Sequence, residues 1–164
     1  MGVSTIDGTL EEAVLKRVRR NLRVYERLTF RLADGTTRSI AKPIVDQALA
    51  AHLMPGTSGR FYLYTAIDHR GIHGVRDAEG RAAFSYPTNN EKALLIVMPI
   101  LLLWIVVALV LQGGIPIFGT LVLVISLPFY FLYRKTRMEA RRQFETDTAY
   151  RPSSAPLAEQ AAGS

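Results

Sequence analysis

The most prominent pattern along the chain is a long apolar stretch in its second half. From Ala93 to Tyr133 there is no Asp, Glu, Lys, Arg or His. An apolar run of about 18 residues or more is typical of a membrane span, and a helix needs about 20 residues to cross the bilayer. The segment Gln112-Gly113-Gly114, followed by Pro116, provides a turn halfway along. We therefore predict a helical hairpin in the membrane at residues 91–133, with spans at 93–111 and 115–133.

Basic residues on either side of the apolar stretch predict its orientation. Arg134, Lys135 and Arg137 follow the second span directly and Lys92 precedes the first, whereas the turn carries no charge. Because Lys and Arg near span ends stay on the cytoplasmic side, we expect both termini in the cytoplasm. Arg greatly outnumbers Lys, which is typical of a GC-rich bacterial genome, so the expected location is the bacterial inner (plasma) membrane. Residues 134–164 are predicted to form a cytoplasmic tail that is first basic and then disordered.

The predicted spans contain no ionisable side chain. A transport path within a single chain is therefore not expected, since such paths are usually lined by charged or polar groups. Trp104 falls near mid-span, away from the interfaces where Trp is favoured, so its indole N–H indicates a protein contact rather than lipid. Gly119 would allow helices to approach closely. Trp104 and Gly119 are therefore candidate contacts with a partner in the membrane.

Residues 1–90 have a different pattern, which predicts a β-rich cytoplasmic domain. Between Val18 and Leu32 apolar side chains alternate with Arg and Thr, and Asp34-Gly35 separates this run from a returning strand at 36–40. Residues 9–22 fit two patterns, because Thr9 and Glu12 also match a helix capping box. We favour a strand from about Val14 onward.

The rest of this domain is predicted to contain a short helix and a β-meander. Pro43 suits the first position of a helix whose apolar face runs from Ile44 to Leu53. Residues 60–67, 72–76 and 81–86 read as three strands joined by turns at 68–71 and 77–80. About five strands and one helix suit a small curled sheet or partly open barrel of the OB or SH3-like kind. The expected fold class is thus an α+β membrane protein, and this class by itself carries no function.

Charge adds candidate contacts to this picture. The formal net charge is +6, and arginines are dense between residues 17 and 31. They could attract anionic lipid headgroups, bind nucleic acid through its phosphates, or form a solvated face that keeps the domain in the cytoplasm. The interspersed acids Glu11, Glu12, Glu26 and Asp34 argue against nucleic acid. The candidate lipid-facing basic residues are Arg17, Arg19, Arg23, Arg27, Arg134, Lys135 and Arg137.

Candidate catalytic chemistry is sparse. The absence of Cys excludes disulfides, thiolate metal sites and thiol-linked lipids, and no phosphate-binding loop, nucleophile elbow or HExxH-type motif is present. His69 and His73, with Asp68 adjacent, have a spacing that places two imidazoles together on a helix, but Gly71 and Gly74 indicate turn and strand there. We therefore predict no catalytic residue, no metal and no cofactor. An enzyme that uses Asp68, His69 and His73 is the least favoured alternative.

These features predict a non-catalytic inner-membrane protein. The expected role is an accessory, scaffolding or regulatory subunit of a membrane assembly, with the lipid bilayer and a membrane protein as partners. The alternative is a membrane-tethered sensor or adaptor whose basic domain binds anionic lipid, a ligand or nucleic acid.

Overall fold

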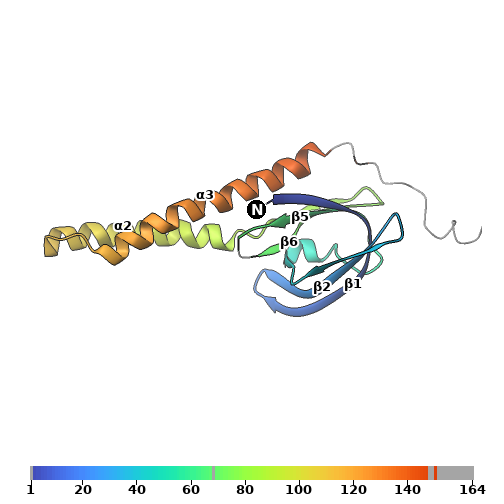
Figure 1. The fold of residues 1–164 in the computed structure, drawn as a ribbon, viewed down its shortest axis with the longest axis horizontal. Helices are drawn as coiled ribbons and strands as arrows, with labels where there is room; N and C mark the ends of the chain where they lie inside the picture. The colour runs from blue at the N-terminus through green and yellow to red at the C-terminus, as the bar shows by residue number, and fades with distance from the viewer. Residues whose placement is uncertain (1, 68, 148–149, 151–164) are drawn as a thin grey trace, which may run out of the picture. The chain divides into compact units, whose positions relative to one another are not determined.

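The computed structural model describes residues 2–67, 69–147 and 150 (Figure 1). These residues form two compact units, one built from those of 1–86 together with those from Ala140 onward, the other from Pro87–Glu139. The elements follow in the order β1 (Gly2–Arg19), β2 (Leu22–Leu32), β3 (Thr37–Ala41), β4 (Ile44–Asp46), α1 (Gln47–Ala50), β5 (Ser58–Thr65), β6 (Arg70–Asp77), β7 (Ala82–Phe84), α2 (Asn89–Gln112) and α3 (Ile117–Thr146).

The first unit contains a barrel-like sheet of five strands. The strands pair in the order β1-β5-β6-β4-β2, and a further pairing of β1 with β2 closes the ring. Every pair in the ring is antiparallel except β4 with β6, which is parallel. The long β1 serves both sides of the closure, because Gly2–Thr9 pair with β5 and Gly8–Arg19 pair with β2. Figure 1 shows β1 and β2 curving together. β3 extends the sheet beside β2, and β7 beside β6.

Two glycines allow close approach of backbones at the joins of this barrel. Gly8 lies where β1 faces both neighbours, opposite Leu32 and Gly59. Gly71 lies opposite Ile44 in the parallel pair. A Cβ at Gly8 would collide with the carbonyl oxygen of Arg31, and a Cβ at Gly71 with that of Ile44. Only a residue without a side chain fits such positions.

The barrel encloses an apolar core. The rings of Phe30 and Phe61 pack with centroids 4.8 Å apart, and Leu49 and Leu53, in α1 and just after it, complete the cluster. Burial of this apolar area is the main favourable contribution to folding. The buried members are Ile6, Leu10, Tyr25, Leu28, Phe30, Ile40, Val45, Leu49, Ala50, Leu53, Phe61, Leu63, Ile72 and Val75.

Most of the strands predicted from sequence are confirmed. The strand favoured from Val14 exists, but β1 already begins at Gly2, so the capping-box alternative for residues 9–22 is wrong. Thr9 instead pairs with Arg31 on one side and Ser58 on the other. Register shifts between Leu10 and Arg17 interrupt the alternation, which explains why the sequence pattern was ambiguous. The predicted meander corresponds to β5, β6 and β7.

The helix expected from Pro43 is only partly correct. Ile44 and Val45 belong to β4 and pair with both β2 and β6. The helix α1 begins at Gln47, because the side chain of Asp46 accepts a hydrogen bond from the backbone N–H of Ala48 and caps it. Two β-branched residues next to open strand edges therefore prevail over the helix-start signal of the proline.

The second unit is the predicted helical hairpin. Within the described residues α2 and α3 are two helices long and apolar enough to cross a membrane. Gly113 ends α2 in the left-handed conformation, with φ 67° and its N–H bonded to the carbonyl of Leu109. The ring of Trp104 lies against Gly119, so Gly119 does allow close approach, here between the two helices of the same chain. Near the other end, the almost buried Glu91 forms an ion pair of 3.1 Å with Arg137.

Candidate functional site

The candidate site is the place where the end of α3 packs on the barrel. Phe61 and Leu63 of β5 point into the core, whereas Tyr62 and Tyr64 are fully buried without belonging to it. Since successive side chains of a strand point to opposite faces, both faces of β5 are covered. The second cover is the last part of α3, from Ala140 to Thr146.

Phe144 is the apolar anchor of this contact. Its ring lies 5.0 Å from that of Tyr62 and 5.2 Å from that of Phe84, measured between centroids. Gly74 of β6 leaves the space for it, because a Cβ there would be 2.6 Å from Cδ2 of Phe144. The guanidinium of Arg76 stacks over the Phe144 ring at 4.7 Å and donates a 2.9 Å hydrogen bond to its backbone carbonyl. Arg76 thus satisfies a carbonyl that the helix end would leave unpaired.

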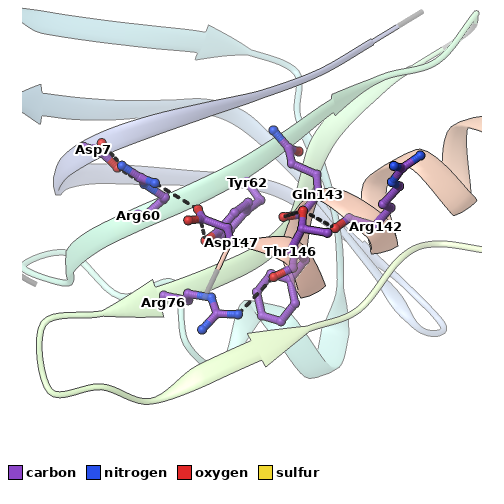
Figure 2. Close-up of polar contacts among 9 residues, drawn as sticks. Asp7, Arg60, Tyr62, Arg76, Arg142, Gln143, Thr146 and Asp147 are labelled. Atoms are coloured by element: carbon purple, nitrogen blue, oxygen red, sulfur yellow. Dashed lines mark hydrogen bonds and ion pairs between the residues drawn. The ribbon is translucent and has the colours of Figure 1, made fainter. Parts of the chain in front are cut away.

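Asp147 forms the polar half of the contact, directly after α3. Its carboxylate accepts a 2.7 Å hydrogen bond from the hydroxyl of Tyr62 and one of 2.9 Å from Arg60. Figure 2 shows Arg60 between Asp147 and Asp7, which it binds through two further bonds of 2.6 and 2.7 Å. Burial opposes the ionisation of Asp147, but the hydrogen bonds from Tyr62 and Arg60 outweigh it and lower its pKa. Burial, reinforced by Asp147, raises the pKa of Tyr62.

His73 lies at the centre of this face and is fully buried. Its ring is surrounded by those of Tyr62, Tyr64, Phe84 and Tyr86, with centroids 5.8 to 6.3 Å away. In the described part of the chain neither ring nitrogen makes a well-formed hydrogen bond, although the backbone of Ala140 is close enough to favour the protonated ring. Burial outweighs this effect and lowers the pKa of His73 to about 4. The imidazole is therefore neutral at pH 7 and shielded from solvent.

The fold does not support the alternative of an enzyme site that uses His69 and His73. His69 precedes β6 and is partly exposed, with its ring 5.4 Å from Tyr64, whereas His73 lies inside β6. The two residues do not share a helix, and Asp68 lies outside the described residues. Across residues 2–67, 69–147 and 150, no group of three His, Cys, Asp or Glu side chains is arranged to hold a metal ion.

The candidate basic residues are placed in different environments. Arg27 pairs with Glu12 at 3.1 Å, and Arg137 with Glu91. Lys135 is 3.9 Å from Glu139, and Arg134 is exposed. In contrast, Arg17, Arg19 and Arg23 form no ion pair with any described residue.

An open groove of about 300 Å³ lies between α2 and α3. Its lining is mostly apolar, and its polar members carry amide and hydroxyl groups. The lining residues are Asn90, Ala93, Leu94, Ile125, Ser126, Phe129 and Tyr133.

Comparison of the chain with protein-family models, curated protein sequences and solved structures gives no significant match. Function is therefore inferred from the chain's own residues. Sequence reasoning missed the contacts that Phe144 and Asp147 make with side chains of β5 and β6. One signal was present, because the unbroken run of Phe61 to Tyr64 lacks the polar alternation of a strand with one solvated face.

Proposed function

We propose that this protein is a non-catalytic, membrane-anchored accessory subunit whose barrel serves a larger membrane assembly. The observation that carries the proposal is the double role of α3. This helix begins as an apolar candidate span and ends, from Ala140, as part of the barrel unit. The residues that follow the second candidate span therefore belong to the barrel unit.

The contact between the end of α3 and the barrel combines an apolar and a charged contribution. Full burial of an aromatic side chain contributes about 2–3 kcal/mol, and the partly buried Phe144 gains a fraction of this. The Asp147–Arg60 pair has side chains only 19% and 26% exposed, and a charge-assisted bond of this kind is roughly twice as strong as a neutral one. Such a contact supports a scaffolding or regulatory role for the barrel unit.

The proposed location is the bacterial inner membrane, with two spans and both termini in the cytoplasm. The charge pattern around the hairpin supports this orientation. We also infer that the barrel is of the OB kind, because its strand order, its parallel β4–β6 pair and the position of α1 before β5 fit that arrangement. This likeness concerns the fold and leaves the ligand open.

Purification with a matched pair of variants tests the proposal. The full chain, isolated in mild detergent after cross-linking in cells, is expected to carry a membrane protein in comparable amount. Phe144→Ala should reduce that amount several-fold while the chain stays in the membrane fraction. Glu145→Gln, which alters an exposed neighbour paired with Arg141, should leave it unchanged. Mass spectrometry quantifies both.

Three outcomes would contradict the proposal. A chain that purifies without any comparable partner has no place as a subunit. A partner retained equally by wild type and Phe144→Ala would show that the docked helix end plays no part in the assembly. Loss of the chain from the membrane fraction would refute the membrane anchor itself.

A sensor or adaptor role is the second candidate. It is favoured by one observation, the cluster of arginines at the turn between β1 and β2 that has no acidic partner among the described residues.

A further inference from the structure

The end of the β1–β2 hairpin, residues 15–24 and here called the tip, has an unusual composition for a solvated hairpin. The three β1–β2 pairs nearest the turn each place an aliphatic residue opposite an arginine. Aliphatic and arginine side chains therefore lie on both faces of the hairpin. These pairs are Arg17 with Val24, Val18 with Arg23, and Arg19 with Leu22.

Among the described residues, the arginines of the tip have no counter-ion, whereas the basic residues next to them along the strands have one. Lys16, near the start of the tip, pairs with Glu26, and further along the strands Arg27 pairs with Glu12 and Arg31 with Glu11. From residue 17 to residue 24 the sequence contains no acid. No described residue forms an ion pair with Arg17, Arg19, Arg20 or Arg23. Asp46, which lies opposite Leu22 in β4, is engaged as the cap of α1.

The apolar side chains of the tip are exposed beside these charges. Val18 is 55% exposed and Leu15 47%, and Val14 next to them is exposed as well. A single exposed aliphatic residue is ordinary. Several of them at the end of one basic hairpin indicate a surface that becomes buried when it binds a partner.

The backbone of the tip is also costly to form. Arg20 has φ 39°, a conformation that glycine adopts easily and other residues avoid. Keeping an arginine at this position sacrifices stability, and such strain is typical of functional sites. The strain therefore indicates that the side chain of Arg20 has a function at this position.

We propose that the tip inserts into an anionic lipid surface, with its arginines on lipid phosphates and with Leu15 and Val18 in the apolar layer beneath. Arginine binds phosphate through a planar fork of donors, and basic residues near an anionic bilayer each contribute about 1 kcal/mol. The inference rests on the membrane anchor proposed above, since a chain held in a bilayer meets such a surface at high effective concentration.

Two other occupants fit the tip less well. A nucleic acid would use the arginines but leave Leu15 and Val18 exposed, and the aromatic residue at hand, Tyr25, is buried and cannot stack on bases. A partner strand could add to the free edge of β1, but three register shifts between Leu10 and Arg17 break the regular ladder that strand addition requires.

The absence of cysteine from the chain permits a direct test. The full-length variant Val18→Cys, labelled with an environment-sensitive fluorophore and reconstituted in vesicles, reports whether the tip enters lipid. We expect a blue shift and strong quenching by lipid-attached quenchers when one third of the lipid is phosphatidylglycerol. In pure phosphatidylcholine both effects should be weak. The same label at Ala33→Cys, in the exposed turn after β2, should sense no lipid in either vesicle.

Substitutions at the tip separate lipid binding from folding. Each of Arg17→Gln, Arg19→Gln and Arg20→Gly should lower the ratio of inserted to free tip about fivefold in anionic vesicles. Arg20→Gly relieves the backbone strain, so it should unfold at the same or a higher temperature while it binds lipid less. Arg31→Gln, which removes a charge paired with Glu11 away from the tip, should change the quenching little.

Several results would overturn the inference. Equal quenching of the Val18→Cys label in neutral and anionic vesicles would remove the role of the arginines. Quenching absent from both, in a chain that floats with the vesicles, would refute tip insertion while leaving the membrane anchor intact. Displacement of the tip from anionic vesicles by low concentrations of duplex DNA would assign it to nucleic acid.

Discussion

Single residues explain both the strength and the limits of sequence reasoning here. The glycines at 71 and 74 correctly excluded a helical pair of histidines, but the sequence could not show that these glycines make room for the carbonyl of Ile44 and the ring of Phe144. His73 reads as a polar residue of an exposed strand, yet it is fully buried among aromatic rings. Burial of this kind depends on a segment far along the chain, which no local pattern contains.

The buried imidazole makes the stability of the barrel unit depend on pH. Because the pKa of His73 falls from 6.5 to about 4 on folding, the unfolded chain binds more protons between these values. Stability is therefore complete above pH 6.5 and is lost as the pH falls toward 4, by about 3 kcal/mol in total. Denaturant unfolding in detergent, followed by circular dichroism across this range, measures the loss. His73→Phe should remove most of it.

His69→Gln is the matched control, since it changes a partly exposed imidazole and should keep the slope of the wild type. The lowered pKa of Asp147 places its titration below this range, so the two residues do not interfere. An unchanged slope in His73→Phe would contradict the assignment.

The close approach at Gly71 yields a second test at the residue scale. A methyl group there meets the carbonyl of Ile44, so Gly71→Ala must push β4 and β6 apart. We expect destabilisation of about 1–3 kcal/mol, the usual effect of overpacking, measured as a lower midpoint of thermal unfolding. Gly2→Ala adds the same methyl group where nothing lies within 4 Å and should leave the midpoint unchanged. Equal midpoints for the two variants would contradict the close approach of β4 and β6 at Gly71.

At the scale of elements, regular periodicity was read correctly and irregular periodicity was not. The two apolar helices and the strands β5 to β7 occur where the sequence predicts them, although α3 continues beyond the predicted span to Thr146. β1 fails because its register shifts move side chains from one face to the other, and β4 fails because Pro43 resembles a helix start. In both cases pairing with strands distant in sequence decides the structure.

The packing of α2 against α3 can be examined through the single tryptophan of the chain. Gly119→Leu collides with the ring of Trp104 and should force it from the helix contact into the surrounding lipid or detergent. Quenching of tryptophan emission by brominated lipid should rise several-fold. Gly114→Leu, where a Cβ meets nothing within 4 Å, should leave the quenching unchanged. Unaltered emission in Gly119→Leu would mean that the two helices do not meet at this point.

At the scale of the whole molecule, the hairpin and a small β-rich domain could be predicted, but the composition of the units could not. Residues from Ala140 onward were assigned to a tail by their charge, whereas those described up to Asp147 belong with the barrel. The predicted disorder beyond residue 150 lies outside the described residues. Charge and hydropathy report on a segment's relation to solvent, and they carry no record of which distant surface covers it.

The placement of Phe144 and Asp147 after both apolar helices has a consequence for biosynthesis. Chains emerge from the ribosome from the N-terminus, so β1 to β7 are complete before α2 and α3 exist. Until Ala140 to Asp147 have been made, the face bearing Tyr62 and His73 lacks its cover. The last surface of the barrel is therefore closed only after the hairpin has been translated, which makes maturation of the barrel unit a late event that follows synthesis of the two apolar helices.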